Sequence, residues 1–148
     1  MVVGMGGATE ASIWSNFINI PEEIPKDWIS IPYGKALKNQ VYRITDNLGR
    51  ICPDYVRGEL LIGGVGVAKG YRGDMELTSK KFIQKDNMKW YRTGDNGRTW
   101  NDGTIEFLGR LDNQVKVKGH RIELGEIEIA IERFKGVKNV DRKSTRLN

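Results

Sequence analysis

Cysteine is almost absent from this sequence of 148 residues: Cys52 is the only one, so an internal disulfide is excluded. No stretch approaches the run of about eighteen apolar residues that a membrane-spanning helix needs. The first residues also lack the basic flank and apolar core of a secretory signal. We therefore expect a cytoplasmic protein that does not contact a membrane.

The sequence has only a small excess of positive charge. The sequence holds 24 Lys and Arg against 19 Asp and Glu, and the two signs are interleaved along most of the chain. Binding to a nucleic-acid backbone depends on clustered cations, so no nucleic-acid partner is expected. The net charge of +5 is compatible with a locally cationic pocket for a small phosphorylated ligand.

Glycine is abundant, with 18 residues, and the segments between the glycines read mainly as strands. Alternating or apolar runs predict strands at 2–5, 13–14 with 17–20, 40–46, 58–64, 89–93, 98–100, 104–109, 115–118, 120–123 and 137–140. Helix-compatible spacing predicts a short helix at 74–82. Apolar side chains at intervals of three and four residues predict a helix at 126–134, which Gly136 ends.

The segment GGATEAS at 6–12 is the first candidate for chemistry. Its glycines allow a backbone to approach a ligand closely, Thr9 offers a hydroxyl, and Glu10 offers a hard oxygen ligand for Mg2+. The alternative is a plain turn between two strands that carries a surface acid.

A second candidate combines YRTGD at 91–95 with TIEFLGRLD at 104–112. Asp95 can accept two hydrogen bonds from a diol such as ribose, and Arg110 can serve a phosphate or sugar oxygen. Each string alone is also common in an ordinary hairpin.

The third candidate is QVKVKGHRIELGEIE at 114–128. Lys116 and Lys118 project to one side of a strand, and Gly119 allows the chain to reverse. From the residues alone, a solvated face is the favoured interpretation of the two lysines, and His120 fits a surface strand residue better than a catalytic base.

Taken in order, the strings GGATEASIWSN, GELLIGGVGVAKGYRGD, YRTGD and GRLDNQVKVKGHRIELGEIE resemble the adenylate-forming superfamily. Within it, the chain is similar to adenylation domains of nonribosomal peptide synthetases over residues 1 to about 140. The resemblance implies a mixed α/β, strand-rich fold. Residues 1–111 would form the C-terminal part of the large subdomain with its distorted β-barrel, and residues 112–148 the hinge and the beginning of the small α/β lid. The polar tail 141–148, DRKSTRLN, departs from the apolar strand expected there and is interpreted as non-native.

The resemblance assigns ATP contacts residue by residue. Glu10 corresponds to the Mg2+ ligand and Thr9 to a neighbour of the nucleotide phosphates. Asp95 corresponds to the carboxylate that holds both ribose hydroxyls, Arg110 to the partner of ribose and phosphate, and Phe107 to an aromatic wall near adenine.

The resemblance also implies a two-step ligase reaction. An amino acid and ATP give an aminoacyl-AMP and pyrophosphate, and the phosphopantetheine thiol of a peptidyl carrier domain then displaces AMP. Asp112 corresponds to the hinge between the two subdomains, Lys116 to a lysine used in the second conformation, and Gly119 to the channel of the carrier arm.

Departures from the family pattern bear on the substrate. Gly6 and Ala8 stand where many relatives carry an aromatic residue and a proline. This departure, followed by Ile13 and Trp14, resembles cysteine-activating, thiazoline-forming modules that build siderophore-like peptides. Met5, Ile13 and Trp14 would then line the amino-acid pocket. Serine, threonine and other small amino acids remain competitors of cysteine.

Several family elements have no counterpart in the sequence: the phosphate-binding loop, the aspartate that grips the substrate ammonium, and the adenylating lysine. The chain alone is therefore expected to be inactive, as a fragment of the enzyme. Two alternatives remain open: an acyl-CoA synthetase or stand-alone amino-acid ligase of the same superfamily, and an inactive nucleotide-binding remnant.

Overall fold

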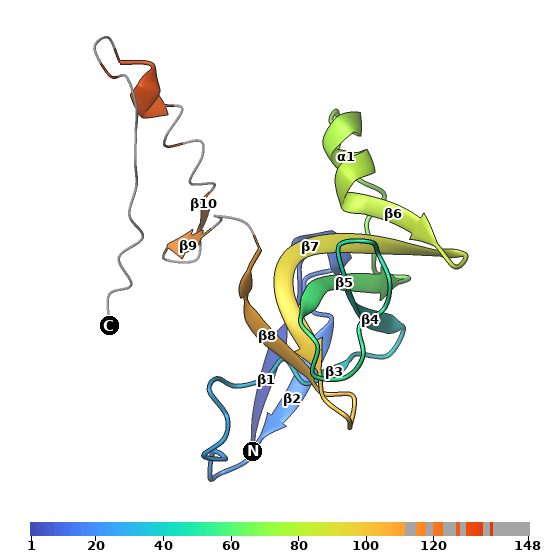
Figure 1. Ribbon diagram of the computed structural model, residues 1–148, viewed down its shortest axis with the longest axis vertical. Coiled ribbons are helices and arrows are strands. Elements are labelled where there is room, and N and C mark those ends of the chain that lie inside the picture. Colours follow the sequence, from blue (N-terminus) through green and yellow to red (C-terminus); the bar gives the residue numbers. More distant parts are fainter. Residues whose placement is uncertain (112–114, 118–119, 123–126, 128–129, 135–136, 138–148) are drawn as a thin grey trace. The chain divides into compact units, whose positions relative to one another are not determined.

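The computed structural model describes residues 1–111, 115–117, 120–122, 127, 130–134 and 137. The chain divides into two compact units, Met1–Leu111 and Asp112–Asn148. The first unit is built almost entirely of antiparallel strands (Figure 1). The mixed α/β, strand-rich fold class predicted from the sequence is thereby confirmed. None of the helices in the described residues has the length and apolar character needed to cross a membrane.

A three-stranded antiparallel sheet opens the first unit, in the order β1 (Val2–Gly6), β2 (Asn16–Ile20) and β3 (Lys35–Ala36). Gly6 faces Asn16 in the register of β1 and β2, so the nine residues between them close a tight connection. That connection contains the short 3-10 helix η1 (Thr9–Ala11).

The larger sheet has five strands and curls strongly around its longest member. Strand β7 pairs with β6 over its first residues, with β8 over its last residues and with β5 over residues 90–97, while β4 pairs with β5. Figure 1 shows the bend of β7, and register shifts interrupt its pairing near Glu59 and Asp95. The strands are β4 (Gln40–Thr45), β5 (Gly58–Gly64), β6 (Phe82–Lys85), β7 (Met88–Thr99) and β8 (Ile105–Arg110).

The apolar core joins the two sheets. Alternation along β4 and β5 turns Ile44, Leu60 and Ile62 to one side, where they pack with Ile105 of β8 and Ala11 of η1. Ala11 is completely buried. The connection that holds Thr9 and Glu10 is therefore anchored in the core of the larger sheet.

Gly34 makes a second link between the sheets. Its N–H and carbonyl both bond to Ile105, at 3.2 and 2.7 Å. The φ of Gly34 is +81°, and a Cβ there would lie 2.0 Å from the carbonyl oxygen of Phe17. Only glycine fits this position.

Helix α1 (Met75–Lys81) confirms the predicted helix at 74–82. Asp74 caps it by accepting a hydrogen bond from the Leu77 N–H at 2.8 Å, and Lys80 and Lys81 occupy its last turn. The chain continues directly into β6 (Figure 1).

Two predictions for the first unit were wrong. Residues 13–14 were predicted as part of a strand, but Ser12 and Ile13 have φ values of 62° and 69°, so the chain turns there and β2 begins at Asn16. Residues 88–99 form one long strand instead of two short ones, because the bulge at Asp95 lets the pairing continue past Gly94.

In the second unit, the predicted strand pair is confirmed as β9 (Val115–Val117) and β10 (His120–Ile122), which are antiparallel. The described residues 127 and 130–132 of the second predicted helix are helical. Most of the strand predicted at 137–140 lies outside the described residues.

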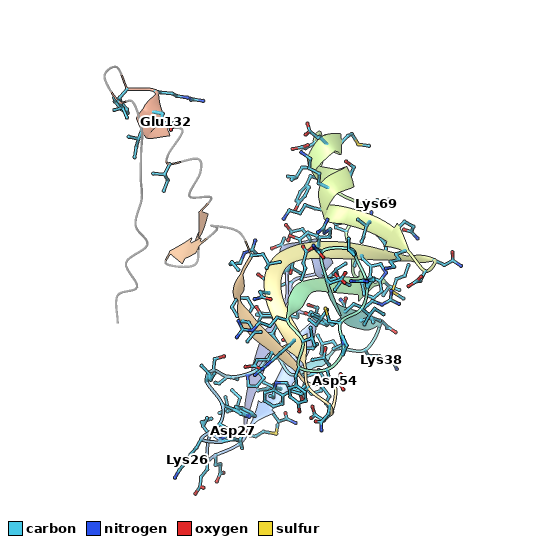
Figure 2. All side chains as sticks on the ribbon, viewed as in Figure 1. Lys26, Asp27, Lys38, Asp54, Lys69 and Glu132 are labelled. Atoms are coloured by element: carbon cyan, nitrogen blue, oxygen red, sulfur yellow. The ribbon has the colours of Figure 1, made fainter. Side chains whose placement is uncertain are left out.

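Charged side chains of both signs lie on the exposed loops. Figure 2 labels Lys26 with Asp27 on the loop between β2 and β3, and Lys38 and Asp54 on other loops, all of them exposed. This distribution agrees with the interleaved charge of the sequence.

Candidate functional site

Asp95 and Arg110 meet where β7 pairs with β8. Arg110 Nη1 donates to Asp95 Oδ1 at 2.7 Å and to the Thr93 carbonyl at 2.8 Å. The side chains of Asp95 and Arg110 are 17% and 22% exposed, so the ion pair is partly shielded from water and its geometry is constrained.

The backbone around Asp95 is equally well held. Thr93 Oγ1 accepts from the Asp95 N–H at 2.9 Å and donates to the Leu60 carbonyl at 2.7 Å. Gly94 supplies a φ of +72° between them. Threonine, glycine and aspartate in this order therefore aim one carboxylate at the β8 side of the bulge.

An aromatic surface lies on the same strand as Arg110. The Phe107 ring stacks on the Tyr33 ring at 5.2 Å between centroids, with only 7° between their planes. Burial, followed by the negative charge of Asp95, raises the pKa of Tyr33 well above its usual range. Asp95 is therefore close enough to act electrostatically on this aromatic pair.

Tyr42 links this region to the residues that follow η1. Its hydroxyl shares a hydrogen bond with Ser15 Oγ and accepts one from Asn16 Nδ2 at 2.9 Å. Burial raises the pKa of Tyr42, and Asp95 adds to that rise against the two hydrogen bonds. The phenol thus bonds to Ser15, at the end of the β1–β2 connection, and to Asn16 of β2, and it also lies within the electrostatic influence of Asp95.

The turn that carries Thr9 and Glu10 is tightly constrained. The Ala8 carbonyl accepts from the N–H groups of Ala11 and Ile13 at 2.9 and 3.0 Å. Gly7 has a φ of +150°, and a Cβ there would lie 2.6 Å from Ser15 Oγ. The glycine is required because the backbone passes so close to the strand that follows.

Glu10 is held from a distant part of the chain. Its Oε1 accepts from the Tyr71 hydroxyl at 2.7 Å, and its carbonyl accepts from the Ala68 N–H at 2.8 Å. Burial, and then the bond to Glu10, raises the pKa of Tyr71 far above its usual range. The phenol therefore stays protonated and acts as the donor.

The predicted ATP residues fall into two groups. Asp95, Arg110 and Phe107 lie together on β7 and β8, whereas Thr9 and Glu10 lie on η1, which the core ties to β8 through Ala11 and Ile105. The convergence of Glu10, Asp95 and Arg110 around one nucleotide remains a prediction.

Glu10 can serve as a Mg2+ ligand if a bound nucleotide supplies further ligands. Among the residues that the structure describes, no three His, Cys, Asp or Glu side chains gather where they could enclose a metal ion. Mg2+ is, however, commonly bound by one or two carboxylates together with substrate phosphates and water. Glu10 suits a metal that arrives with a nucleotide.

The predicted substrate residues are exposed. Met5, Ile13 and Trp14 are 48%, 57% and 52% exposed, which is unusual for large apolar side chains that lie so close together in the chain. Their role in an amino-acid pocket stays a prediction.

The second unit leaves three predictions untested. Lys116 lies in β9 opposite Arg121, and nothing is described of its side chain. Asp112 and Gly119 lie outside the described residues.

A cavity of about 260 Å3 lies on the face of the larger sheet that is opposite to the core residues Ile44, Leu60 and Ile62. The Arg43 guanidinium covers the Trp90 ring there at 4.3 Å and pairs with Asp86. None of the predicted site residues lines this cavity. It is bounded by Arg43, Thr45, Asp46, Asn47, Leu48, Gly49, Leu61, Ile83, Lys85, Trp90 and Arg92.

Sequence reasoning missed the three tyrosines that surround the site, Tyr33, Tyr42 and Tyr71. Tyr71 alone carried a signal, because it lies within GYRGD between two glycines. The partners of all three are far away in the sequence, so no local pattern predicted the contacts.

Known proteins resemble this chain over most of its length. The sequence pattern of the AMP-binding enzyme family matches residues 1–72. The Anguibactin system regulator of Vibrio anguillarum is 58% identical over 135 residues, which cover 91% of this chain and 13% of that protein. Pyochelin synthetase PchE of Pseudomonas aeruginosa is 57% identical over 127 residues, which cover 86% of this chain and 9% of that protein. The chain therefore spans a small share of the length of these relatives.

A solved structure agrees in both fold and sequence. The Vibrio cholerae adenylation domain AlmE, in complex with glycyl-adenosine-5'-phosphate, superimposes with a TM-score of 0.79 at 34% identity. The match covers 88% of this chain and 25% of the AlmE chain.

Proposed function

Since this chain belongs to the AMP-binding enzyme family and is a segment of an adenylation domain of the nonribosomal peptide synthetase type, we propose that the protein containing it activates an amino acid with ATP. The product is an aminoacyl-AMP. The observation that carries the proposal is the constrained Asp95–Arg110 pair beside the stacked ring of Phe107. A carboxylate, a cation and a flat apolar surface on neighbouring strands match the chemistry of a nucleoside monophosphate.

Within this proposal, the nucleoside lies along β7 and β8. Asp95 accepts hydrogen bonds from the two ribose hydroxyls, and Arg110 orients Asp95 while it serves a ribose or phosphate oxygen. Phe107, backed by Tyr33, supports one face of adenine.

The phosphates are assigned to the η1 side. Thr9 offers its hydroxyl to a phosphate oxygen, and Glu10 would hold Mg2+ together with phosphate oxygens. Bound Mg2+ would neutralise negative charge on the phosphates. The buried position of Ala11 keeps both side chains on a rigid turn, as positioning of reactants requires.

The reaction is attack of the amino-acid carboxylate on the α-phosphorus of ATP. A new C–O–P bond forms, the bond to the β-phosphate oxygen breaks, and pyrophosphate leaves with the electron pair. The thiolate of a carrier phosphopantetheine then attacks the acyl carbon and releases AMP. We assign the switch between these steps to the hinge at Asp112, with Lys116 and Gly119 serving the second step.

Cysteine is the proposed amino acid. Met5, Ile13 and Trp14 would form an apolar part of the pocket, and their exposure leaves them accessible to a substrate. Serine, threonine and another small amino acid are the competing substrates. The product of the whole pathway is proposed to be a siderophore-like peptide made in the cytoplasm.

The test is amino-acid-dependent ATP–pyrophosphate exchange by the complete protein that carries this chain. Cysteine should stimulate exchange at least tenfold more than acetate or a fatty acid. A fatty acid together with CoA as the best substrates would instead indicate an acyl-CoA synthetase. Absence of exchange with every amino acid, while ATP still binds, would indicate an inactive remnant.

A further inference from the structure

Tyr71 approaches Glu10 from 61 residues further along the chain. The phenol donates to Glu10 Oε1 at 2.7 Å. In the same segment, the Ala68 N–H donates to the Glu10 carbonyl at 2.8 Å. Residues 68–71 therefore hold both the backbone and the carboxylate of Glu10.

The position of Tyr71 is itself fixed by helix α1. The Tyr71 N–H donates to Thr78 Oγ1 at 2.9 Å, and Thr78 Oγ1 donates to the Asp74 carbonyl at 2.6 Å. Gly70, with a φ of +149°, lies so close to Thr78 that a Cβ would be 2.4 Å from its Cγ2. The chain before Tyr71 is thus pressed against the helix.

The Tyr71 ring is held by other aromatic rings. It packs edge-on against Phe82 at 5.4 Å, and Phe82 packs against Tyr91 at 5.3 Å. Tyr91 also shares a hydrogen bond with the Tyr71 phenol. Because these contacts involve only protein groups, the hydroxyl is in place before any ligand binds.

A carboxylate that accepts a bond from a fixed donor loses rotational freedom. Groups that hydrogen-bond to a metal ligand commonly orient it in this way. Charge-assisted hydrogen bonds of this kind are also among the stronger ones.

We propose that Tyr71 is a positioning residue that orients the Glu10 carboxylate toward the metal of a bound magnesium nucleotide. This inference rests on the proposed function, because it takes Glu10 as the metal ligand. Tyr71 itself touches neither the nucleotide nor the metal. Its removal should weaken metal affinity about 10- to 100-fold, as is typical for such groups.

The experiment uses the complete protein with a non-hydrolysable ATP analogue and Mn2+ in place of Mg2+. Free Mn2+, measured by electron paramagnetic resonance, reports metal affinity without any turnover. Tyr71→Phe should raise the dissociation constant at least tenfold. In pyrophosphate exchange it should raise the KM for Mg2+ by a similar factor while kcat recovers at saturating Mg2+.

The matched control is Tyr91→Phe. It removes the hydroxyl that bonds to Tyr71 but leaves the phenol that bonds to Glu10, so the Mn2+ dissociation constant should change less than twofold. Thermal unfolding of both variants is measured in parallel. If both variants lose stability, the difference between their Mn2+ dissociation constants still reports the loss of the hydrogen bond to Glu10.

Glu10→Gln separates the two possible failures. If Glu10→Gln weakens Mn2+ binding and Tyr71→Phe changes it less than twofold, the positioning role is wrong and the proposed nucleotide site stands. If Glu10→Gln leaves Mn2+ binding unchanged, the metal role of Glu10 fails, and the positioning role of Tyr71 fails with it.

Discussion

Arg110 and Asp95 face each other across β7 and β8, and Nη1 of the arginine lies 2.7 Å from Oδ1 of the aspartate. The pair sits at a β-bulge, where one strand carries an extra residue. The extra residue is on β8, where two residues separate Phe107 from Arg110 while one separates Gly97 from Asp95, so the bulge places Arg110 opposite Asp95. The proposed nucleotide site depends on this local irregularity.

Asp95→Ala should weaken ATP binding to the complete protein by about 1–3 kcal/mol, since it removes two hydrogen bonds to ribose. Isothermal titration calorimetry measures this change directly. The control is Asp86→Asn, which removes an exposed partner of Arg43 on the opposite sheet face. An ATP affinity of Asp95→Ala equal to that of the parent protein would refute the ribose role.

Trp14→Ala should alter the choice of amino acid. A single methylene in an apolar pocket typically changes relative kcat/KM values by about 10- to 200-fold, so truncating the whole indole should change them by at least that much. Exchange with cysteine should fall, and exchange with a bulkier amino acid should rise. Ile31→Ala, at another exposed apolar residue, is the control, and an unchanged substrate ranking in both variants would exclude Trp14 from the pocket.

Lys116→Ala should separate the two steps of the proposed reaction. Pyrophosphate exchange should stay within about threefold of the parent, whereas loading of the carrier thiol should fall at least tenfold. Both rates are measured on the same preparation, the second with radiolabelled amino acid. Equal loss in both assays would contradict a role confined to thioester formation.

Gly34→Ala should be far more destabilising than Gly103→Ala. The two glycines have nearly equal φ values, +81° and +82°, but a Cβ at Gly103 meets nothing within 4 Å. Gly103→Ala should therefore cost only the left-handed backbone penalty of about 1–2 kcal/mol. Gly34→Ala adds a clash with the Phe17 carbonyl and should cost more than about 4 kcal/mol. Urea unfolding compares the variants, and equal costs would show that the backbone relaxes at Gly34.

Glu106 should make the β7–β8 hairpin sensitive to acid. Although burial opposes it, hydrogen bonds from Arg98 and Trp100 hold the pKa of Glu106 below its ordinary value of 4.5. A carboxylate whose pKa is lower in the folded protein than in the unfolded chain stabilises the fold at pH values above the unfolded pKa. This stabilisation is lost as the pH falls through the folded pKa. Hairpin stability, followed by hydrogen exchange, should therefore decline below pH 4.5 in the parent. Glu106→Gln should show a shallower decline, and identical profiles would contradict this origin.

Local sequence patterns predicted the regular elements well. Alternation identified β4, an apolar run that stops at a glycine pair identified β5, and helix-compatible spacing over 74–82 identified α1. The patterns failed at Ser12 and Ile13, because a left-handed backbone at non-glycine residues depends on tertiary contacts that no local propensity records.

The candidate site was predictable only in part. The resemblance named Asp95 and Arg110 as site residues, and the structure brings the two into contact. The contacts of Tyr71 with Glu10 and of Tyr33 with Phe107 were not predictable, since each joins segments more than sixty residues apart that no local pattern relates.

Residues Met88–Thr99 form one strand, β7, in spite of the register shifts near Asp95, and this limits how descendants of this sequence can vary in length. Side chains alternate along a strand, so deleting one residue between Trp90 and Asp95 would send the carboxylate to the other surface while the neighbouring strands stayed in place. Evolutionary insertions and deletions should therefore collect in the bends at Asp86–Asn87 and Asn101–Gly103. Between those bends, this strand should keep a constant number of residues in every functional descendant.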